Sequence, residues 1–319
     1  MPGDIFVHPE SFDEDDLADA RKKLRRILQN HFEQLFGYSN SKLLYSAART
    51  ELSMFINSYD CGSEEKIYAI ARFLMSDTFF FPSGNGRHIF AEKPDFDISA
   101  KGILINYARN QNGRIIDIEK ARDYLSKVML SVASIYQTVD IDSGSEFMFY
   151  DSRRIVLKEA LELTDEKLSR ISEMLSDLFG NDIDYIVPRL INDTWLRELP
   201  LPVGVCCTLP LLCHIISVYS DKIGFRCIKP KLKGASVEIL PAAIVPAASE
   251  LTDFNDLLML LVRKFYKLPV TIRGDKLRSM LCDEEMIEHN KFLGLMRKVI
   301  GDDPRFVWSD DRNVTVRDF

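Results

Sequence analysis

Apolar residues near the end of the chain follow a pattern that predicts a helix, a short strand and further helices. Residues 254–266 form an apolar run, and Pro269 ends it because proline lacks the backbone N–H and clashes with the preceding helical turn. Residues 270–272 are β-branched, which favours a strand. We expect a short helix at 275–281. Across 284–299 the apolar residues recur at spacings of three and four, as on one face of a helix.

A hairpin is predicted to follow these helices. Residues 305–308 and 314–316 are rich in apolar and β-branched side chains and flank a polar turn. We therefore expect 305–308 to pair antiparallel with 314–317, and 270–272 to join them as a third strand. The predicted order is helix, strand, helix, helix, hairpin.

The same order of elements is predicted twice more, earlier in the chain. No residue motif is shared among the copies, so the repeat is one of element order. The first copy is expected at helix 98–110, strand 114–116, helices 118–128 and 130–136, and hairpin strands 146–150 and 153–157. The second is expected at helix 164–179, strand 185–187, helices 189–199 and 205–222, and hairpin strands 225–228 and 237–240.

The N-terminal region fits this order less well. Acidic residues followed by basic ones, with apolar positions on one face, predict an amphipathic leader helix at 15–36. Helices are expected at 43–56 and 64–75, with Ser63 as an N-cap. A hairpin is expected about the Asn85-Gly86 turn. No short strand is evident between these helices, which suggests a degenerate copy.

This order resembles tandem winged-helix proteins, helix-turn-helix folds with a β-hairpin wing. The expected fold class is mainly α with small β hairpins (α+β), a tandem array of such modules preceded by an amphipathic helix. The resemblance implies either DNA binding or protein docking. The expected divisions are a leader at 1–38, a degenerate module at 39–94, and modules at 95–161, 162–247 and 248–319.

The charge of the chain limits how it could bind nucleic acid. The chain has 319 residues, a formal net charge of -7 and a pI of about 5.4. A protein that coats DNA without sequence preference is expected to be basic, because phosphate contacts dominate its affinity. Any DNA or RNA binding must therefore use local basic patches.

Three basic clusters are candidates for phosphate contacts, because wings and helix starts touch the backbone in such folds. For each cluster, a solvated surface is an equally good interpretation. Asp310 and Asp311, at the tip of the last predicted wing, would repel phosphate. The candidates are Arg226, Lys229, Lys231 and Lys233; Arg263, Lys264, Lys267, Lys276 and Arg278; and Arg153 with Arg154.

The six cysteines are expected to be reduced thiols of a cytoplasmic protein. Cys206, Cys207, Cys213 and His214 are the best metal candidates, but their spacing is not that of paired zinc knuckles. We therefore expect buried, metal-free cysteines, a buried and hydrogen-bonded histidine, and no cofactor. Residues 199–219 are apolar, but the prolines in their first half argue against a membrane span.

Motif searches favour a binding protein over an enzyme. The sequence has no Walker loop, no His-Glu-x-x-His and no Gly-x-Ser-x-Gly. The first hypothesis is a non-enzymatic nucleic-acid-binding or regulatory module, excised from a longer protein. The alternative is a protein–protein interaction scaffold that uses winged helices to dock a partner. A third is an enzyme whose dispersed site the sequence does not reveal.

Overall fold

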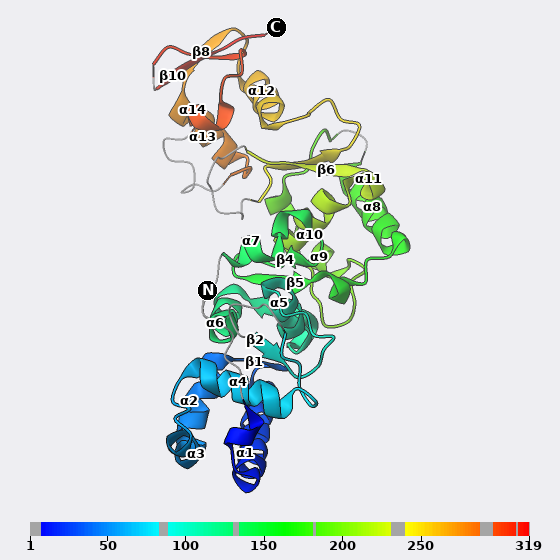
Figure 1. Cartoon of the computed structure of the whole chain (residues 1–319). Coiled ribbons are helices and arrows are strands. Elements are labelled where there is room, and N and C mark those ends of the chain that lie inside the picture. The colour runs from blue at the N-terminus through cyan, green and yellow to red at the C-terminus, as the bar shows by residue number, and fades with distance from the viewer. Residues whose placement is uncertain are drawn as a thin grey trace. The chain divides into compact units, whose positions relative to one another are not determined.

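A computed structural model shows an α+β protein whose helices accompany small antiparallel sheets (Figure 1). The structure describes residues 8–82, 89–129, 134–180, 183–230, 240–287, 296–310 and 312–318. The chain divides into two compact units, Met1–Asp140 and Ile141–Phe319. Each unit is described by itself.

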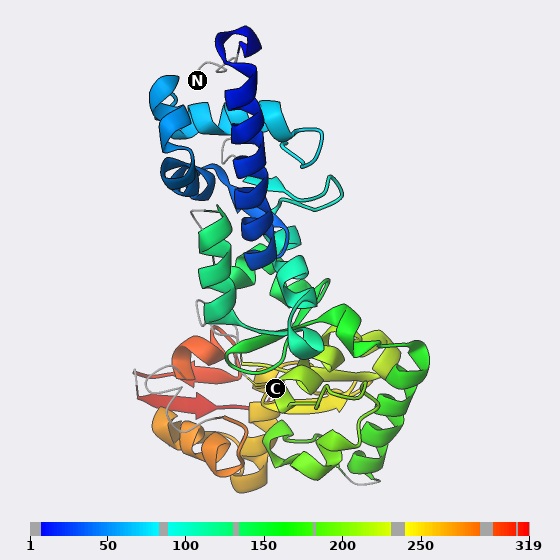
Figure 2. The same cartoon turned by 90° about the horizontal axis from the view of Figure 1, so that it is seen from below.

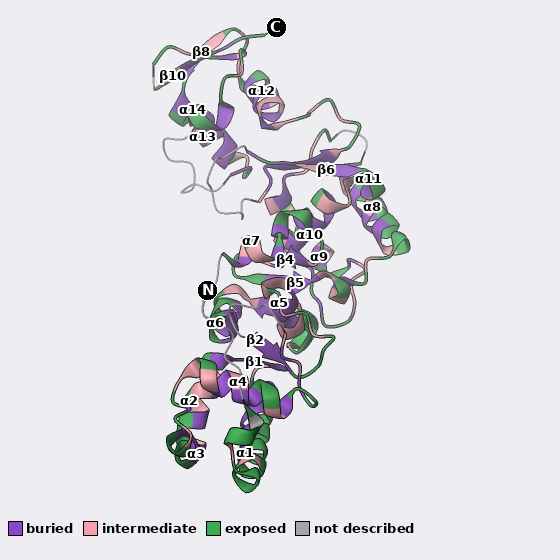
Figure 3. Cartoon of the chain, viewed as in Figure 1, coloured by how far each residue is buried: buried purple, intermediate pink, exposed green. Residues whose placement is uncertain are grey.

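The first unit begins with helices that share one core. Asp13 caps α1 by accepting hydrogen bonds from the N–H groups of Asp15 and Asp16, and Ser63 caps α4 as predicted. The predicted leader helix is not separate from the helices after it, because Leu24 and Phe32 of α1 belong to the same buried cluster as residues of α2 and α4. Helix α1 lies beside α2 and α4 (Figure 2), and Figure 3 colours the buried parts of these helices purple. The bounds are η1 Pro9–Ser11, α1 Glu14–Gln34, α2 Ser41–Glu51, α3 Ser53–Ser58 and α4 Glu64–Met75.

A short strand follows α1, where the sequence analysis found none. Strand β1 (Tyr38–Asn40) pairs antiparallel with β2 (Ile89–Ala91), and Phe80 forms a bridge to Ala91 on the other side of β2. The strand is fully buried although it contains Ser39 and Asn40. The predicted Asn85-Gly86 turn lies outside the described residues.

Hydrogen bonds satisfy the two buried polar side chains of β1. The Ser39 hydroxyl lies 2.9 Å from Nδ1 of His31, and Asn40 Nδ2 donates to the carbonyls of Lys127 and Val128. The Asn40 contacts join β1 to the last turn of α6. The remaining elements of this unit are α5 Ala100–Arg109, η2 Asn112–Arg114, β3 Ile115–Asp117, α6 Ile118–Met129 and α7 Ile135–Val139.

The second unit opens with the predicted hairpin of β4 and β5, which pair antiparallel from Phe147↔Leu157 to Phe149↔Ile155. Thr164 caps α8 by accepting a hydrogen bond from the N–H of Lys167. The predicted helices 189–199 and 205–222 are each broken into two shorter pieces. The bounds are η3 Ile141–Ser143, β4 Phe147–Phe149, β5 Arg154–Leu157, η4 Lys158–Leu161, α8 Asp165–Phe179, η5 Pro188–Leu190, α9 Asp193–Arg197, α10 Leu209–Val218 and α11 Ser220–Ile223.

The second hairpin of this unit differs from its predicted register. Strand β6 (Phe225–Ile228) pairs with β7 (Ala243–Pro246), so the predicted partner 237–240 is wrong; most of it lies outside the described residues. Ile186, in the predicted strand 185–187, bridges Ile244 on the other side of β7. That bridge fixes β7 between two neighbours.

The predicted three-stranded sheet at the end of the chain is confirmed. Strand β10 pairs antiparallel with β8 on one side and with β9 on the other. The predicted long helix 284–299 is wrong at its start, because residues 284–287 form a turn in which Glu285 has a φ of 55°. Its last part is helical as α14, and residues 288–295 lie outside the described residues. The bounds are α12 Phe254–Phe265, β8 Val270–Arg273, α13 Gly274–Asp283, α14 Met296–Ile300, β9 Phe306–Trp308 and β10 Asn313–Val316.

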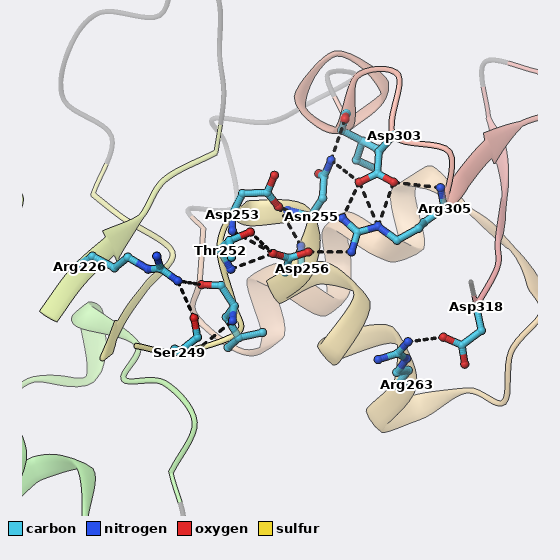
Figure 4. A network of polar contacts seen from close by, with 12 residues as sticks. Arg226, Ser249, Thr252, Asp253, Asn255, Asp256, Arg263, Asp303, Arg305 and Asp318 are labelled. Atoms are coloured by element: carbon cyan, nitrogen blue, oxygen red, sulfur yellow. Dashed lines mark hydrogen bonds and ion pairs between the residues drawn. The ribbon is translucent and has the colours of Figure 1, made fainter. Parts of the chain in front are cut away.

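A polar network fixes the start of α12 to the segment between α14 and β9 (Figure 4). Asp253 and Asp256 form a capping box at the N-terminus of α12. Arg305 donates to Asp256 at 2.7 Å and to Asp303 at 2.6 Å, and Asn255 Nδ2 donates to the Ile300 carbonyl. Burial alone would raise the pKa of Asp256. Hydrogen bonds from Thr252 and Arg305 outweigh that effect and lower the pKa to about 2.

The apolar stretch 199–219 does not form one long helix. Its helical part, α10, contains ten residues and begins at Leu209, with Pro210 in its first turn. None of the helices in the described ranges has the length and apolar character needed to cross a membrane.

Candidate nucleic-acid interface

Arg226, the first predicted phosphate contact, forms hydrogen bonds within the fold. The side chain of Arg226 is half-buried, and its Nη2 donates to the carbonyls of Ser249 and Leu251, both at 2.8 Å. These bonds join β6 to the segment that leads into α12 (Figure 4). Lys231 and Lys233, from the same predicted cluster, lie outside the described residues.

Three further candidates form ion pairs. Arg263 pairs with Asp318, Lys264 pairs with Glu284 at 2.7 Å, and Arg154 pairs with Asp151. Burial alone would raise the pKa of Asp151, but the hydrogen bond from Arg154 outweighs that effect and lowers it. A cation held by a carboxylate attracts phosphate less than an unpaired one, because the pair carries no net charge.

The other candidates differ in exposure. Arg278 is half-buried on α13, and its Nε is buried without a hydrogen-bond partner among the described residues. The exposed candidates, none of them in an ion pair within the described ranges, are Arg153, Lys229, Lys267 and Lys276.

Lys276 also belongs to a group of lysines at helix starts that sequence reasoning missed. Lys42 is the second residue of α2, Lys120 the third of α6 and Lys276 the third of α13, and all three are exposed. Each of these helices directly follows a short strand: β1, β3 or β8. A lysine in the first turn opposes the helix dipole, so helix stability does not explain this recurrence. The sequence does not reveal this shared position, because it does not define at which residue each helix begins.

The turn between β9 and β10, the tip of the last predicted wing, presents an acidic residue, as the sequence indicates. The Asp310 carboxylate accepts hydrogen bonds from the backbone N–H groups of Arg312 and Asn313. The hydrogen bonds from Asn313 and Arg312 lower the pKa of Asp310, so the tip stays negative. This hairpin is therefore a poor phosphate contact.

The cysteine cluster is only partly as expected. Cys207 and Cys213 are buried, but Cys206 is exposed, so the expectation of burial is wrong for that residue. Its exposure arises because it lies in the loop before α10, with the nearby Val203 also fully exposed. Within the described ranges, no group of three or more His, Cys, Asp or Glu side chains is placed to hold a metal ion.

His214 is the buried, hydrogen-bonded histidine that the sequence analysis expected. It is 6% exposed, and its Nδ1 accepts a hydrogen bond from the Phe149 N–H at 2.9 Å. Burial, helped by the positive charge of Lys229, lowers the pKa of His214 to about 4. At neutral pH the ring is therefore uncharged and acts as an acceptor that fixes β4 to α10.

Comparisons with known proteins give no relative. No family model, no curated protein and no solved structure matches the chain.

Proposed function

We propose that the chain is a tandem array of four winged helices, in which α1 is the first helix of the first module. The supporting observation is that one order of pairing recurs. In the first module β2 lies between β1 and Phe80. In the third module β7 lies between Ile186 and β6, and in the fourth β10 lies between β8 and β9. In each case the last strand lies between an earlier and a middle segment of its module.

The second module repeats the order of elements. A helix (α5), a short strand (β3), two helices (α6 and α7) and a hairpin (β4 and β5) follow one another there. On this division the leader helix and the first hairpin belong to one module. The inferred modules then run from α1 to β2, α5 to β5, α8 to β7 and α12 to β10.

The function we propose is non-enzymatic binding of the phosphate backbone of nucleic acid. The observation that carries it is the exposed lysine in the first turn of the second helix of three modules, Lys42, Lys120 and Lys276. In a helix-turn-helix unit this helix crosses the nucleic-acid backbone, and helix N-termini present N–H groups to phosphate. The net charge of -7 means that binding is local. Because it depends on phosphate contacts, it is weakened by salt.

Protection of lysines from acetylation tests this role. The full chain is treated with a lysine-acetylating reagent with and without duplex DNA at low salt, and modified peptides are quantified by mass spectrometry. Lys42, Lys120 and Lys276 should be protected at least several-fold, whereas the exposed Lys22 and Lys127 should react equally in both samples. Equal reactivity of all five lysines contradicts the proposal.

A protein-docking scaffold is the second candidate, and the ion pairs favour it. Arg154, Arg263 and Lys264 are paired with carboxylates, and Arg226 is bonded to carbonyls. A surface on which cations are neutralised in this way is better suited to a protein than to phosphate. In the acetylation experiment, this candidate predicts no protection by DNA.

A further inference from the structure

The second unit contains a groove of about 820 Å³ between residues 183–195 and α12. Its lining is mainly apolar and includes Tyr185, Val187, Trp195 and Leu260. The nucleic-acid role proposed above does not use it.

One wall of the groove is the free edge of a small sheet. Ile186 exchanges two backbone hydrogen bonds with Ile244 of β7, at 2.9 and 2.8 Å. Because backbone groups alternate in direction along a strand, those of Tyr185 and Val187 point away from β7. The Val187 carbonyl accepts from the Leu190 N–H. Among the described residues, no backbone partner is found for the N–H and C=O of Tyr185 or for the N–H of Val187.

Apolar side chains that remain in solvent flank this edge. Ile183 is 51% exposed and Leu190 is 63% exposed, and both line the groove. Side chains of this size exposed beside unpaired backbone groups are a liability for aggregation unless a partner covers them.

Most charged groups at the groove are already neutralised in pairs. Lys264 lies 2.7 Å from Glu284, and Arg263 pairs with Asp318. The remaining charged lining residue, the exposed Asp184, is negative, so the groove does not attract phosphate. The N–H and C=O of Tyr185 and the N–H of Val187 remain available for hydrogen bonds, and they are spaced as on the edge of a strand.

We propose that this groove binds an extended apolar segment of a partner protein, which adds as a strand to the edge formed by residues 185–187. Backbone hydrogen bonds to Tyr185 and Val187 supply affinity, and alternate apolar side chains of the segment enter the groove beside Leu190 and Trp195. This is the strand-addition mode of peptide recognition. It gives the chain a protein-binding site in addition to the proposed nucleic-acid contacts.

Titration of the full chain with short peptides tests the proposal. The probes are peptides of about seven residues in which valine, isoleucine, leucine, phenylalanine, tyrosine or tryptophan alternates with threonine, flanked by lysine for solubility. Binding is followed by methyl NMR and by hydrogen exchange. At least one peptide should saturably shift the methyl signals of Val187 and Leu190 and slow exchange of the Tyr185 and Val187 N–H groups. No saturable shift at millimolar peptide, or a shift elsewhere only, overturns the proposal.

Two substitutions separate backbone pairing from apolar contact. Val187→Pro removes the N–H, and its φ of −82° is one that proline adopts. Val187→Ala is the matched control that keeps the N–H. The dissociation constant should rise at least ten-fold in Val187→Pro relative to Val187→Ala. Equal affinity of these two variants overturns strand addition.

Leu190→Glu tests the apolar wall. It should also raise the dissociation constant ten-fold or more, whereas Met54→Glu, at an 84% exposed position of the first unit, should leave it unchanged. Binding unaffected by Leu190→Glu overturns the site. Sedimentation of the parent tests the alternative occupant, a second copy of the chain. If the parent is a dimer that both Val187→Pro and Leu190→Glu dissociate, the second copy covers the edge. That result would overturn the assignment to a partner protein.

Discussion

Individual side chains in this protein have structural roles that charge and spacing alone do not reveal. Arg226 was predicted to contact phosphate because it lies in a basic run, yet its guanidinium bonds the carbonyls of Ser249 and Leu251. The sequence shows the charge but not the distant carbonyls, which lie more than twenty residues further along the chain. His214 was predicted correctly because its neighbours in the sequence are apolar.

Replacing Arg226 should destabilise the second unit. Arg226→Met leaves two carbonyls without their donor, which we expect to lower the free energy of unfolding by about 1–3 kcal/mol. The exposed Lys229→Met is the matched control and should change it by less than about 0.5 kcal/mol. Urea unfolding of both variants measures the difference. Equal stability of the two variants would show that the Arg226 bonds contribute nothing.

His214 should make the stability of the second unit depend on pH. Its pKa is about 4 in the folded protein and about 6.5 when unfolded, so the unfolded state binds the extra proton between these values. The free energy of unfolding should therefore fall as pH falls from about 6.5 to about 4, by about 3 kcal/mol at most, and be independent of His214 above that range. Urea unfolding at a series of pH values measures it, and His214→Gln should remove this component. An identical pH dependence in the parent and His214→Gln would contradict the account.

At the scale of elements, local signals predicted most helices and hairpins, and tertiary contacts decided the rest. Helix α4 is where its cap and periodicity place it. Strand β1 was missed because Ser39 and Asn40 are typical of turns, and only their hydrogen bonds with α1 and α6 make their burial possible. The partner of β6 was misplaced because 237–240 has strand-like composition, whereas β7 is fixed by its pairing with both β6 and Ile186.

The candidate site was less predictable than the fold. The basic clusters could be found in the sequence, but the ion pairs of Arg263 with Asp318 and of Lys264 with Glu284 join segments that are distant in the chain. The helix-start lysines share no surrounding motif. Their common position appears only when the starts of α2, α6 and α13 are known.

The network of Arg305 should determine how firmly α12 is held to the segment before β9. Arg305→Met leaves the carboxylates of Asp303 and Asp256 without their cation, and the Asp303 side chain is only 11% exposed. We expect a loss of about 2–3 kcal/mol in the free energy of unfolding. Arg273→Met, which removes an exposed pair with Asp275, should cost less than about 1 kcal/mol. Similar losses in the two variants would contradict the structural role of the network.

Acid should weaken the same network in the parent protein. The pKa of Asp256 is about 2 when folded, below its ordinary value of 3.8, so its ionised form is stabilised by folding. That stabilisation is complete above about pH 4 and is lost as pH falls through about 2. Asp256→Asn should reduce the acid-dependent loss, as measured by urea unfolding between pH 4 and pH 2. An unchanged acid dependence in Asp256→Asn would assign the effect to other carboxylates.

For the whole molecule, the proposal combines a net negative chain with local phosphate contacts. The net charge of -7 opposes general attraction to nucleic acid, so any affinity must come from local groups of cations. Lys42, Lys120 and Lys276 each lie in the first turn of a helix that directly follows a short strand. The peptide groove beside residues 185–187 is independent of these lysines and should retain its affinity when they are replaced.

Salt-dependent DNA binding by the full chain tests the central claim most directly. Duplex DNA is titrated at several salt concentrations with the parent, with the triple variant Lys42→Glu, Lys120→Glu and Lys276→Glu, and with a control of equal charge change, Lys22→Glu, Arg122→Glu and Lys127→Glu. The account predicts that the parent binds at low salt and that each lost phosphate contact lowers the slope of log affinity against log salt by about one. The triple variant should lose about three units of slope, and the control should retain most of the parent's. No salt-dependent binding by the parent, or equal slopes for the two triple variants, would contradict it.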